Sequence, residues 1–207
     1  MNLTHSLELE LAHWNDVISR LPNDSSAYVQ RGMVRFKLAN VDESIAEFDV
    51  AEKLDRRLTP YLWQRGLSYY YASKFAEGAK QFEVDLTVNT HDVEETIWRY
   101  LCIARLHGSG EARKSLLLVR NDPRFVMQRV YDLYAGRCSI DDVLAVGTVN
   151  DQRAKFYSHL YVGLYFEADN QVEQAQNYMT KAVNKHRIDG DYMWWVAVVH
   201  QKLRGWN

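Results

Sequence analysis

Apolar side chains recur at helical spacing along most of this chain, and turn-forming residues separate the resulting segments. Between Ser6 and Leu21 they return every three or four residues on one stripe, and Pro22 ends the pattern. Comparable segments continue to the last one, Asp191–Leu203. The pattern predicts an all-α protein.

A unit of 34 residues repeats within this helical pattern, with fixed offsets of 12, 16 and 19 from its first position. The positions are Gly32, Ser44, Phe48 and Ala51; Gly66, Gly78, Phe82 and Asp85; Tyr100, Ala112, Leu116 and Val119; and Gly163, Ala175, Met179 and Ala182. A glycine inside a helix costs about 1 kcal/mol relative to alanine. Gly32 and Gly66 therefore predict places where two helices approach too closely for a side chain.

The period and its small and aromatic positions resemble the tetratricopeptide repeat (TPR), whose unit is a helical hairpin. The resemblance implies one superhelical solenoid domain of about five hairpins with capping helices at both ends. Its segments are a half-repeat helix at 1–22, hairpins at 25–57, 59–90, 92–122, 123–148 and 151–187, and a capping helix at 189–207, within the single domain 1–207. The hairpin at 123–148 is expected to be shortened, with residues 147–150 as the loop that follows it.

Residues at the segment ends predict where individual helices begin and end. Ser25 or Ser26 is expected to cap the first helix of the first hairpin, and Ser139 the second helix of the shortened one. Pro60 is expected in the first turn of a helix, where its missing N–H has no cost. The second helix of the third hairpin is expected to end just before Asn121.

Three aromatic segments resemble a narrower group, the bacterial new-lipoprotein-I type TPR adaptors. They are Ile97–Leu101, Val130–Gly136 and Phe156–Tyr165. This resemblance implies an adaptor that docks proteases and cell-wall hydrolases, often as a homodimer joined through N-terminal helices. The sequence departs from that group because it has no N-terminal lipidation cysteine.

The charge balance favours a protein partner over nucleic acid. The 25 basic and 27 acidic residues are interspersed and leave a net charge of −2, with an isoelectric point near 6.4. A general nucleic-acid binder normally has a basic face and a high isoelectric point. A local basic group, Lys181, Lys185, His186 and Arg187, with Lys202 and Arg204 beyond it, is interpreted as cations that oppose helix dipoles at C-termini.

The cysteines and the absence of a signal pattern bear on the compartment. Cys102 and Cys138 lie in apolar patterns and are predicted to be buried free thiols, which slightly favours a reducing interior. No secretory signal precedes Asp16, and the longest apolar stretch, Tyr192–Val199, is too short to span a bilayer. A soluble protein of the cytoplasm or an organelle interior is expected, and a trimmed targeting segment stays open.

The titratable residues form no pattern that predicts chemistry. None of the seven histidines pairs with another at helical spacing, so no two-histidine metal face is expected. The carboxylate pairs Glu94/Glu95 and Asp141/Asp142 lie in first helical turns, where they offset the helix dipole. We therefore expect no catalytic residues, no metal and no cofactor, and no enzymatic activity.

The aromatic residues are the stronger functional indication. In TPR proteins the first helix of each hairpin lines a concave groove, and aromatic and arginine side chains often anchor protein interfaces. The groove residues that the glycine register predicts are Gln30, Met33, Lys37, Trp63, Gln64, Tyr70, Tyr71, Trp98, Leu101, Arg105, Tyr157 and Tyr161. Several of them have an alternative interpretation as core between helices. The sequence predicts an adaptor that binds a peptide or helix of a partner protein in this groove.

A second function class is a self-assembling structural or assembly factor without a peptide ligand. Its candidate interface is the apolar stripe of the first helix, Leu7, Leu11, Trp14 and Ile18. This stripe is expected either to cap the stack or to pair with the same helix of a second copy around a two-fold axis. Membrane insertion and nucleic-acid binding are expected in neither class.

Overall fold

The computed structural model describes residues 3–119, 122–146, 151–188 and 190–206. These residues form α-helices and one 3₁₀ helix, and no β-strand occurs among them, which confirms the all-α prediction. None of the described helices has the length and apolar character needed to cross a membrane. The chain divides into two compact units, Met1–Val88 (unit 1) and Asn89–Asn207 (unit 2).

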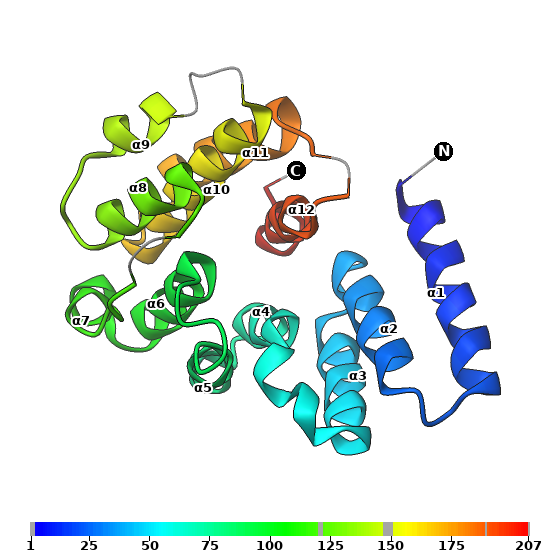
Figure 1. The fold of residues 1–207 in the computed structure, drawn as a ribbon. Coiled ribbons are helices and arrows are strands. Elements are labelled where there is room, and N and C mark those ends of the chain that lie inside the picture. The colour runs from blue at the N-terminus through cyan, green and yellow to red at the C-terminus, as the bar shows by residue number, and fades with distance from the viewer. Residues whose placement is uncertain (1–2, 120–121, 147–150, 189, 207) are drawn as a thin grey trace. The chain divides into compact units, whose positions relative to one another are not determined.

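Unit 1 consists of consecutive helices joined by short turns (Figure 1). Its elements are α1 (Leu3–Arg20), α2 (Ser25–Lys37), α3 (Val41–Leu54), the 3₁₀ helix η1 (Arg56–Tyr61), α4 (Trp63–Tyr71) and α5 (Phe75–Asp85). Helix α2 packs against α3 and α4 packs against α5, so that each pair forms a hairpin. Helix α1 packs on α2, and α3 packs on α4.

Both glycines of unit 1 lie at the close helix contacts that the sequence predicts. A Cβ atom added to Gly32 would lie 3.2 Å from the ring of Phe48. One added to Gly66 would lie 2.6 Å from the ring of Phe82, closer than real Cβ contacts occur. Since Phe48 and Phe82 are fully buried, each ring occupies the space that the missing side chain leaves.

Unit 2 contains three further helix pairs and a terminal helix (Figure 1). Its elements are α6 (Val93–His107), α7 (Ser109–Lys114), α8 (Phe125–Tyr134), α9 (Ile140–Val146), α10 (Gln152–Ala168), α11 (Val172–Lys185) and α12 (Tyr192–Arg204). The first helices of the pairs, α6, α8 and α10, contact one another, and α12 packs on α11. A Cβ atom on Gly163 would lie 3.2 Å from the backbone nitrogen of Met179, which repeats the close contact of unit 1. The α8–α9 pair is short, as predicted, and its predicted loop at 147–150 lies outside the described residues.

The pair α6–α7 departs from the prediction, because α7 ends well before Asn121. The Arg99 guanidinium donates a hydrogen bond of 2.9 Å to the carbonyl of Ser115. The Tyr131 hydroxyl donates one of 3.0 Å to the carbonyl of Leu117. These side chains provide hydrogen-bond donors for the carbonyl groups of a non-helical segment. In a longer helix, backbone N–H groups would be the donors. The predicted end of this helix is wrong.

The first helix boundary in unit 1 also differs from the prediction. The side chain of Asp24 caps α2 by accepting hydrogen bonds from the backbone N–H groups of Ser26, at 3.0 Å, and Ala27, at 3.4 Å. Ser25 is therefore the first helical residue, and neither serine is the cap. The Asp24 carboxylate is a favourable cap for two reasons. It accepts hydrogen bonds from the free backbone N–H groups, and its negative charge lies at the positive end of the helix dipole.

Two further boundary predictions have different outcomes. Ser139 caps α9 as predicted, because its hydroxyl accepts a hydrogen bond of 3.2 Å from the backbone of Asp142. Pro60 lies inside η1 and not in the first turn of α4, which begins at Trp63. A proline fits within η1 because its φ, fixed at about −65°, lies in the range of a 3₁₀ helix.

The two cysteines are free, as the sequence predicts. Cys102 is buried in α6, and burial raises the pKa of its thiol. Cys138 is half-buried, and its thiol contacts the carbonyl of Arg129 at 3.5 Å. Both thiols are therefore protonated near neutral pH.

Candidate partner-binding site

Of the predicted groove residues of unit 1, three are buried, three are half-buried and one is exposed. Gln64, Tyr70 and Tyr71 are buried in α4, and the Tyr71 ring lies 5.6 Å from the ring of Phe36 in α2. Trp63, Met33 and Lys37 are half-buried, whereas Gln30 is exposed. The Lys37 ammonium forms an ion pair of 3.4 Å with Glu10 of α1. Spacing alone does not separate a groove position from a position between two helices.

The predicted groove residues of unit 2 also differ in burial. Trp98, Leu101, Tyr157 and Tyr161 are buried, with exposed fractions of 6% or less. Arg105 is exposed and lies 3.7 Å from the carboxylate of Glu167. The predicted set has members in both units.

The predicted dimerisation stripe lies on the helix face that packs within the chain. Leu7 and Ile18 are buried, and α1 packs against α2. Leu11 and Trp14 are half-buried. The stripe thus contributes to the packing of α1 on α2, and its pairing with a second copy stays a prediction.

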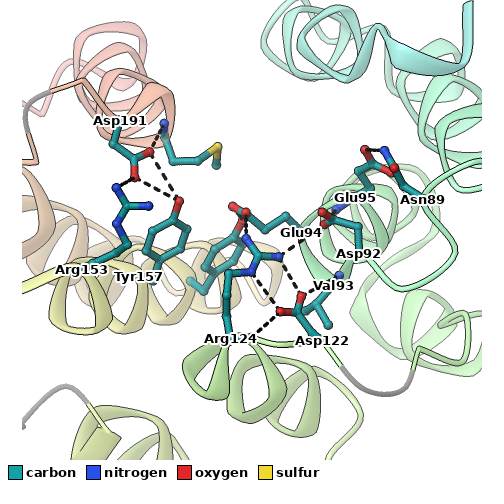
Figure 2. A network of polar contacts seen from close by, with 12 residues as sticks. Asn89, Asp92, Val93, Glu94, Glu95, Asp122, Arg124, Arg153, Tyr157 and Asp191 are labelled. Atoms are coloured by element: carbon teal, nitrogen blue, oxygen red, sulfur yellow. Dashed lines mark hydrogen bonds and ion pairs between the residues drawn. The ribbon is translucent and has the colours of Figure 1, made fainter. Parts of the chain in front are cut away.

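A charged cluster that the sequence interpretation did not identify joins helix starts in unit 2 (Figure 2). At its centre, the Arg124 guanidinium donates two hydrogen bonds to the Asp122 carboxylate, of 3.0 Å from Nε and 2.7 Å from Nη2. Arg124 also forms an ion pair with Glu94, and its Nη2 lies 3.7 Å from Asp92. These contacts connect the N-terminal ends of α6 and α8.

Helix α10 contributes two tyrosine hydroxyls to the same region (Figure 2). The Tyr161 hydroxyl donates a hydrogen bond of 2.8 Å to Glu94. The Tyr157 hydroxyl contacts the carboxylate of Asp191 at 3.3 Å. Asp191 caps α12 through the backbone of Met193. The N-terminal ends of α6, α8 and α12 and the first half of α10 are thereby tied together by polar side chains.

The environment keeps these charges paired. Burial raises the pKa of Glu94, which the positive charge of Arg124 partly offsets. Burial alone would lower the pKa of Arg124, but the hydrogen bonds to Asp122 and the charge of Glu94 raise it instead. Burial likewise opposes ionisation of Asp122, yet the bonds from Arg124 lower the pKa of that carboxyl. The cluster therefore holds the helices in place, and its carboxylates are committed to internal partners.

A recess opens beside this cluster, between the N-terminal ends of α8 and α10. Its volume is about 410 Å³, and the lining residues are Pro123, Arg124, Phe125, Val126, Val146, Asp151, Arg153, Ala154 and Tyr157. The ring of Phe125 is 59% exposed. The Arg153 guanidinium is mostly exposed, and its nearest carboxylate, Asp191, lies 3.5 Å away. The recess therefore combines an apolar wall with an accessible positive charge, which is the make-up of a binding pocket for a side chain.

A short sequence signal marks this region. Asp122 and Arg124, and again Asp151 and Arg153, form an Asp-x-Arg pattern at a helix start. In each case the aspartate accepts a hydrogen bond from the arginine backbone N–H, at 2.8 Å and 2.9 Å. Asp151 is the N-cap residue of α10, whereas the N-cap position of α8 is Arg124 itself and Asp122 precedes it by two residues. Tyr157 is the only predicted groove residue among those that line this recess.

The structure contains no arrangement that points to a metal, as far as it is described: no three His, Cys, Asp or Glu side chains gather there to hold an ion. Comparison of the sequence with protein-family models and with curated proteins finds no match to either. The site must therefore be interpreted from its own geometry.

Proposed function

We propose that this chain is a non-enzymatic adaptor of the tetratricopeptide type that binds a peptide or helix of a partner protein. The main support for this proposal is a close contact between helices that recurs at one spacing. Gly32 meets Phe48, Gly66 meets Phe82, and in unit 2 Gly163 meets the backbone of Met179, each sixteen residues further along the chain. A recurring helical hairpin of this kind is typical of repeat proteins that bind other proteins.

We place the binding face in unit 2, on the layer of first helices α6, α8 and α10. Three observations support this choice over the aromatic residues of unit 1. These helices contact one another directly. The charged cluster around Arg124 fixes their N-terminal ends, which pre-organises the surface. The recess beside Phe125 offers the accessible apolar area that the buried Tyr70 and Tyr71 do not offer.

The make-up of the recess defines the partner segment. A large apolar side chain of the partner enters beside Phe125 and Tyr157, where it buries area against both rings. A neighbouring polar or acidic group of the partner pairs with the Arg153 guanidinium at the rim. Apolar anchors beside a charged rim are the usual composition of small protein interfaces.

Selection of peptides from a random display library on the purified protein tests this proposal. Selected peptides should carry a large apolar residue, and the Phe125→Ser/Arg153→Ser variant should bind them at least tenfold more weakly, about 1.4 kcal/mol. The matched control is Val172→Ser/Lys114→Ser, which changes an apolar residue of 54% exposure and a mostly exposed cation elsewhere in unit 2. Equal binding by both variants, with unchanged circular dichroism, would place the peptide site elsewhere.

A further inference from the structure

A second surface of unit 2 gathers positive charge without counter-charge. Lys155 and His159 of α10 meet Lys181 and Lys185 of α11, together with His186 just after α11 ends; we name these five residues the α10–α11 basic cluster. Within the described residues, none of the three lysines lies within ion-pair distance of a carboxylate. Elsewhere in the unit, arginines such as Arg124 are paired with acids.

The two histidines of the cluster lie against each other. Their ring centroids are 5.0 Å apart, with 34° between the ring planes. His159 Nδ1 donates a hydrogen bond of 2.8 Å to the carbonyl of Lys155, and His186 Nδ1 lies 3.0 Å from the side-chain oxygen of Gln152. Because each Nδ1 carries the proton in these bonds, the neutral rings keep an acceptor at Nε2, which becomes a second donor only when the ring is protonated.

The cluster also has an aromatic edge. The Lys181 ammonium lies 4.6 Å from the ring centroid of Tyr178, and the His159 ring lies 6.0 Å from the same ring. Lys155, Lys181 and His159 are half-buried, and Lys185 is exposed. The cationic groups are thus held near one another and remain accessible at the surface.

We infer that the α10–α11 basic cluster binds an acidic segment of a protein partner, through the three lysines and, at lower pH, the two histidines. This inference goes beyond the proposed function, because the surface is separate from the recess beside Phe125 and its ligand has the opposite chemistry to an apolar anchor. Opposite charges brought together at such a surface steer association and fix the register of a partner.

The size and the setting of the cluster favour acidic side chains over nucleic acid. The whole chain is slightly acidic, with a net charge of −2, so a long polyanion meets repulsion outside this patch. Three lysines neutralise only a few charges, whereas nucleic-acid binding normally depends on a larger number of phosphate contacts. A short run of Asp or Glu side chains matches the patch better.

The histidines give the site a defined pH response. Burial lowers the pKa of His159, and the charges of Lys181 and Lys185 lower it further. Burial also lowers the pKa of His186, as do the charges of His159, Lys155 and Lys185. The neighbours of both histidines are cationic or become so on protonation. A bound carboxylate therefore raises the pKa values of His159 and His186. By linkage, the acidic segment binds more tightly as the pH falls.

Fluorescence anisotropy with a labelled hexaglutamate peptide tests the inference, with hexaglutamine and an oligothymidylate of equal charge as the other probes. Hexaglutamate should bind the full chain, more tightly near pH 5.5 than near pH 7.5, and the Lys155→Gln/Lys181→Gln/Lys185→Gln variant should weaken it at least about tenfold. The control, Lys53→Gln/Lys80→Gln/Lys114→Gln, makes the same charge change at exposed lysines elsewhere and should bind as the parent does.

Two further variants test the lysines and the histidines separately. Lys185→Gln alone, at an exposed position that leaves the fold intact, should weaken hexaglutamate about two- to threefold, and His159→Gln/His186→Gln should abolish the pH dependence. Phe125→Ser, which disables the recess of the proposed function, should leave hexaglutamate binding unchanged. The inference is overturned if hexaglutamine binds equally well, if the two triple variants bind alike, or if the oligothymidylate binds more tightly than hexaglutamate.

Discussion

The helix pair α4–α5 of unit 1 and the pair α6–α7 of unit 2 solve the same packing problem differently. In α4–α5, Gly66 lets the Phe82 ring fill the space between the helices. In α6–α7 the matching position carries Tyr100, whose buried ring packs on Tyr134 of α8, 5.0 Å between centroids. The aromatic side chain comes from the second helix in one pair and from the first helix in the other. A missing glycine therefore does not open the packing; it changes which helix supplies the ring.

The second helices of the two pairs also differ in length. Helix α5 continues to Asp85, three residues beyond the ring of Phe82. Helix α7 ends at Lys114, before the matching position Leu116. Leu116 is half-buried outside the helix, and the Tyr100 ring is buried in the core of unit 2. Three substitutions in these helix pairs should differ in their effect on stability.

Replacement of Tyr100 by alanine should have the largest effect. The ring is 1% exposed, and its loss leaves a cavity between α6 and α8, at a cost of about 3–5 kcal/mol in the free energy of unfolding. Urea denaturation followed by circular dichroism measures this. Tyr61→Ala, which removes a ring of 56% exposure, should change stability by no more than about 0.5 kcal/mol. Similar losses for both variants would show that Tyr100 is not the core residue of this pair.

Replacement of Gly66 by leucine should have the next largest effect. Even a Cβ atom would lie 2.6 Å from the Phe82 ring, so the larger side chain must separate α4 from α5, at a cost of about 3 kcal/mol. Gly110→Leu is the matched control, because no atom lies within 4 Å of a Cβ placed there. A melting temperature of Gly66→Leu that equals the parent's would contradict the close contact.

Part of the fold could be predicted from the sequence. The glycines at 32 and 66 predicted the close contacts, because a glycine inside a helix is unfavourable unless a neighbouring helix needs the space, and Gly163 makes a similar contact in unit 2. The early end of α7 could not be predicted, since the apolar residues after Ser115 continue a helical pattern. Its cause is long-range: Arg99 and Tyr131 bind carbonyl groups of that segment from other helices.

The candidate site was predictable only in part. Tyr157 was identified from its helical register, but the periodicity of α10 gave no indication that both Tyr157 and Tyr161 are buried. The contact of Arg124 with Glu94 joins residues thirty positions apart, and neither residue is unusual in its local sequence. The Asp-x-Arg pattern at two helix starts was visible, yet its meaning depends on which helix ends meet in space.

Replacement of Asp85 by alanine should have the smallest effect, and its sign should depend on pH. Asp85 is fully buried at a repeat position where the other regular pairs carry Ala51 and Ala182, and burial raises the pKa of its carboxyl to about 7. The folded state then holds the proton more tightly than the unfolded state, so the parent loses stability as the pH rises from about 4 to 7. Alanine has no charge to bury.

The stability of Asp85→Ala relative to the parent should therefore rise by about 2–3 kcal/mol between pH 5 and pH 8. Denaturation of both proteins at the two pH values measures it. The other titratable groups, including the buried His200, are common to both proteins and cancel in the difference. An equal difference at both pH values would show that Asp85 is ionised throughout this range.

The most direct test of the binding face is site-specific cross-linking. A photoreactive benzophenone amino acid is placed at position 125, beside the recess, or at position 172, which is similarly exposed on α11. A peptide selected on the unmodified protein is then added to each and irradiated. We expect an efficient cross-link from position 125, which excess unlabelled peptide suppresses, and little from position 172. Equal yields from both positions, or a cross-link from position 172 alone, would contradict the proposed binding face.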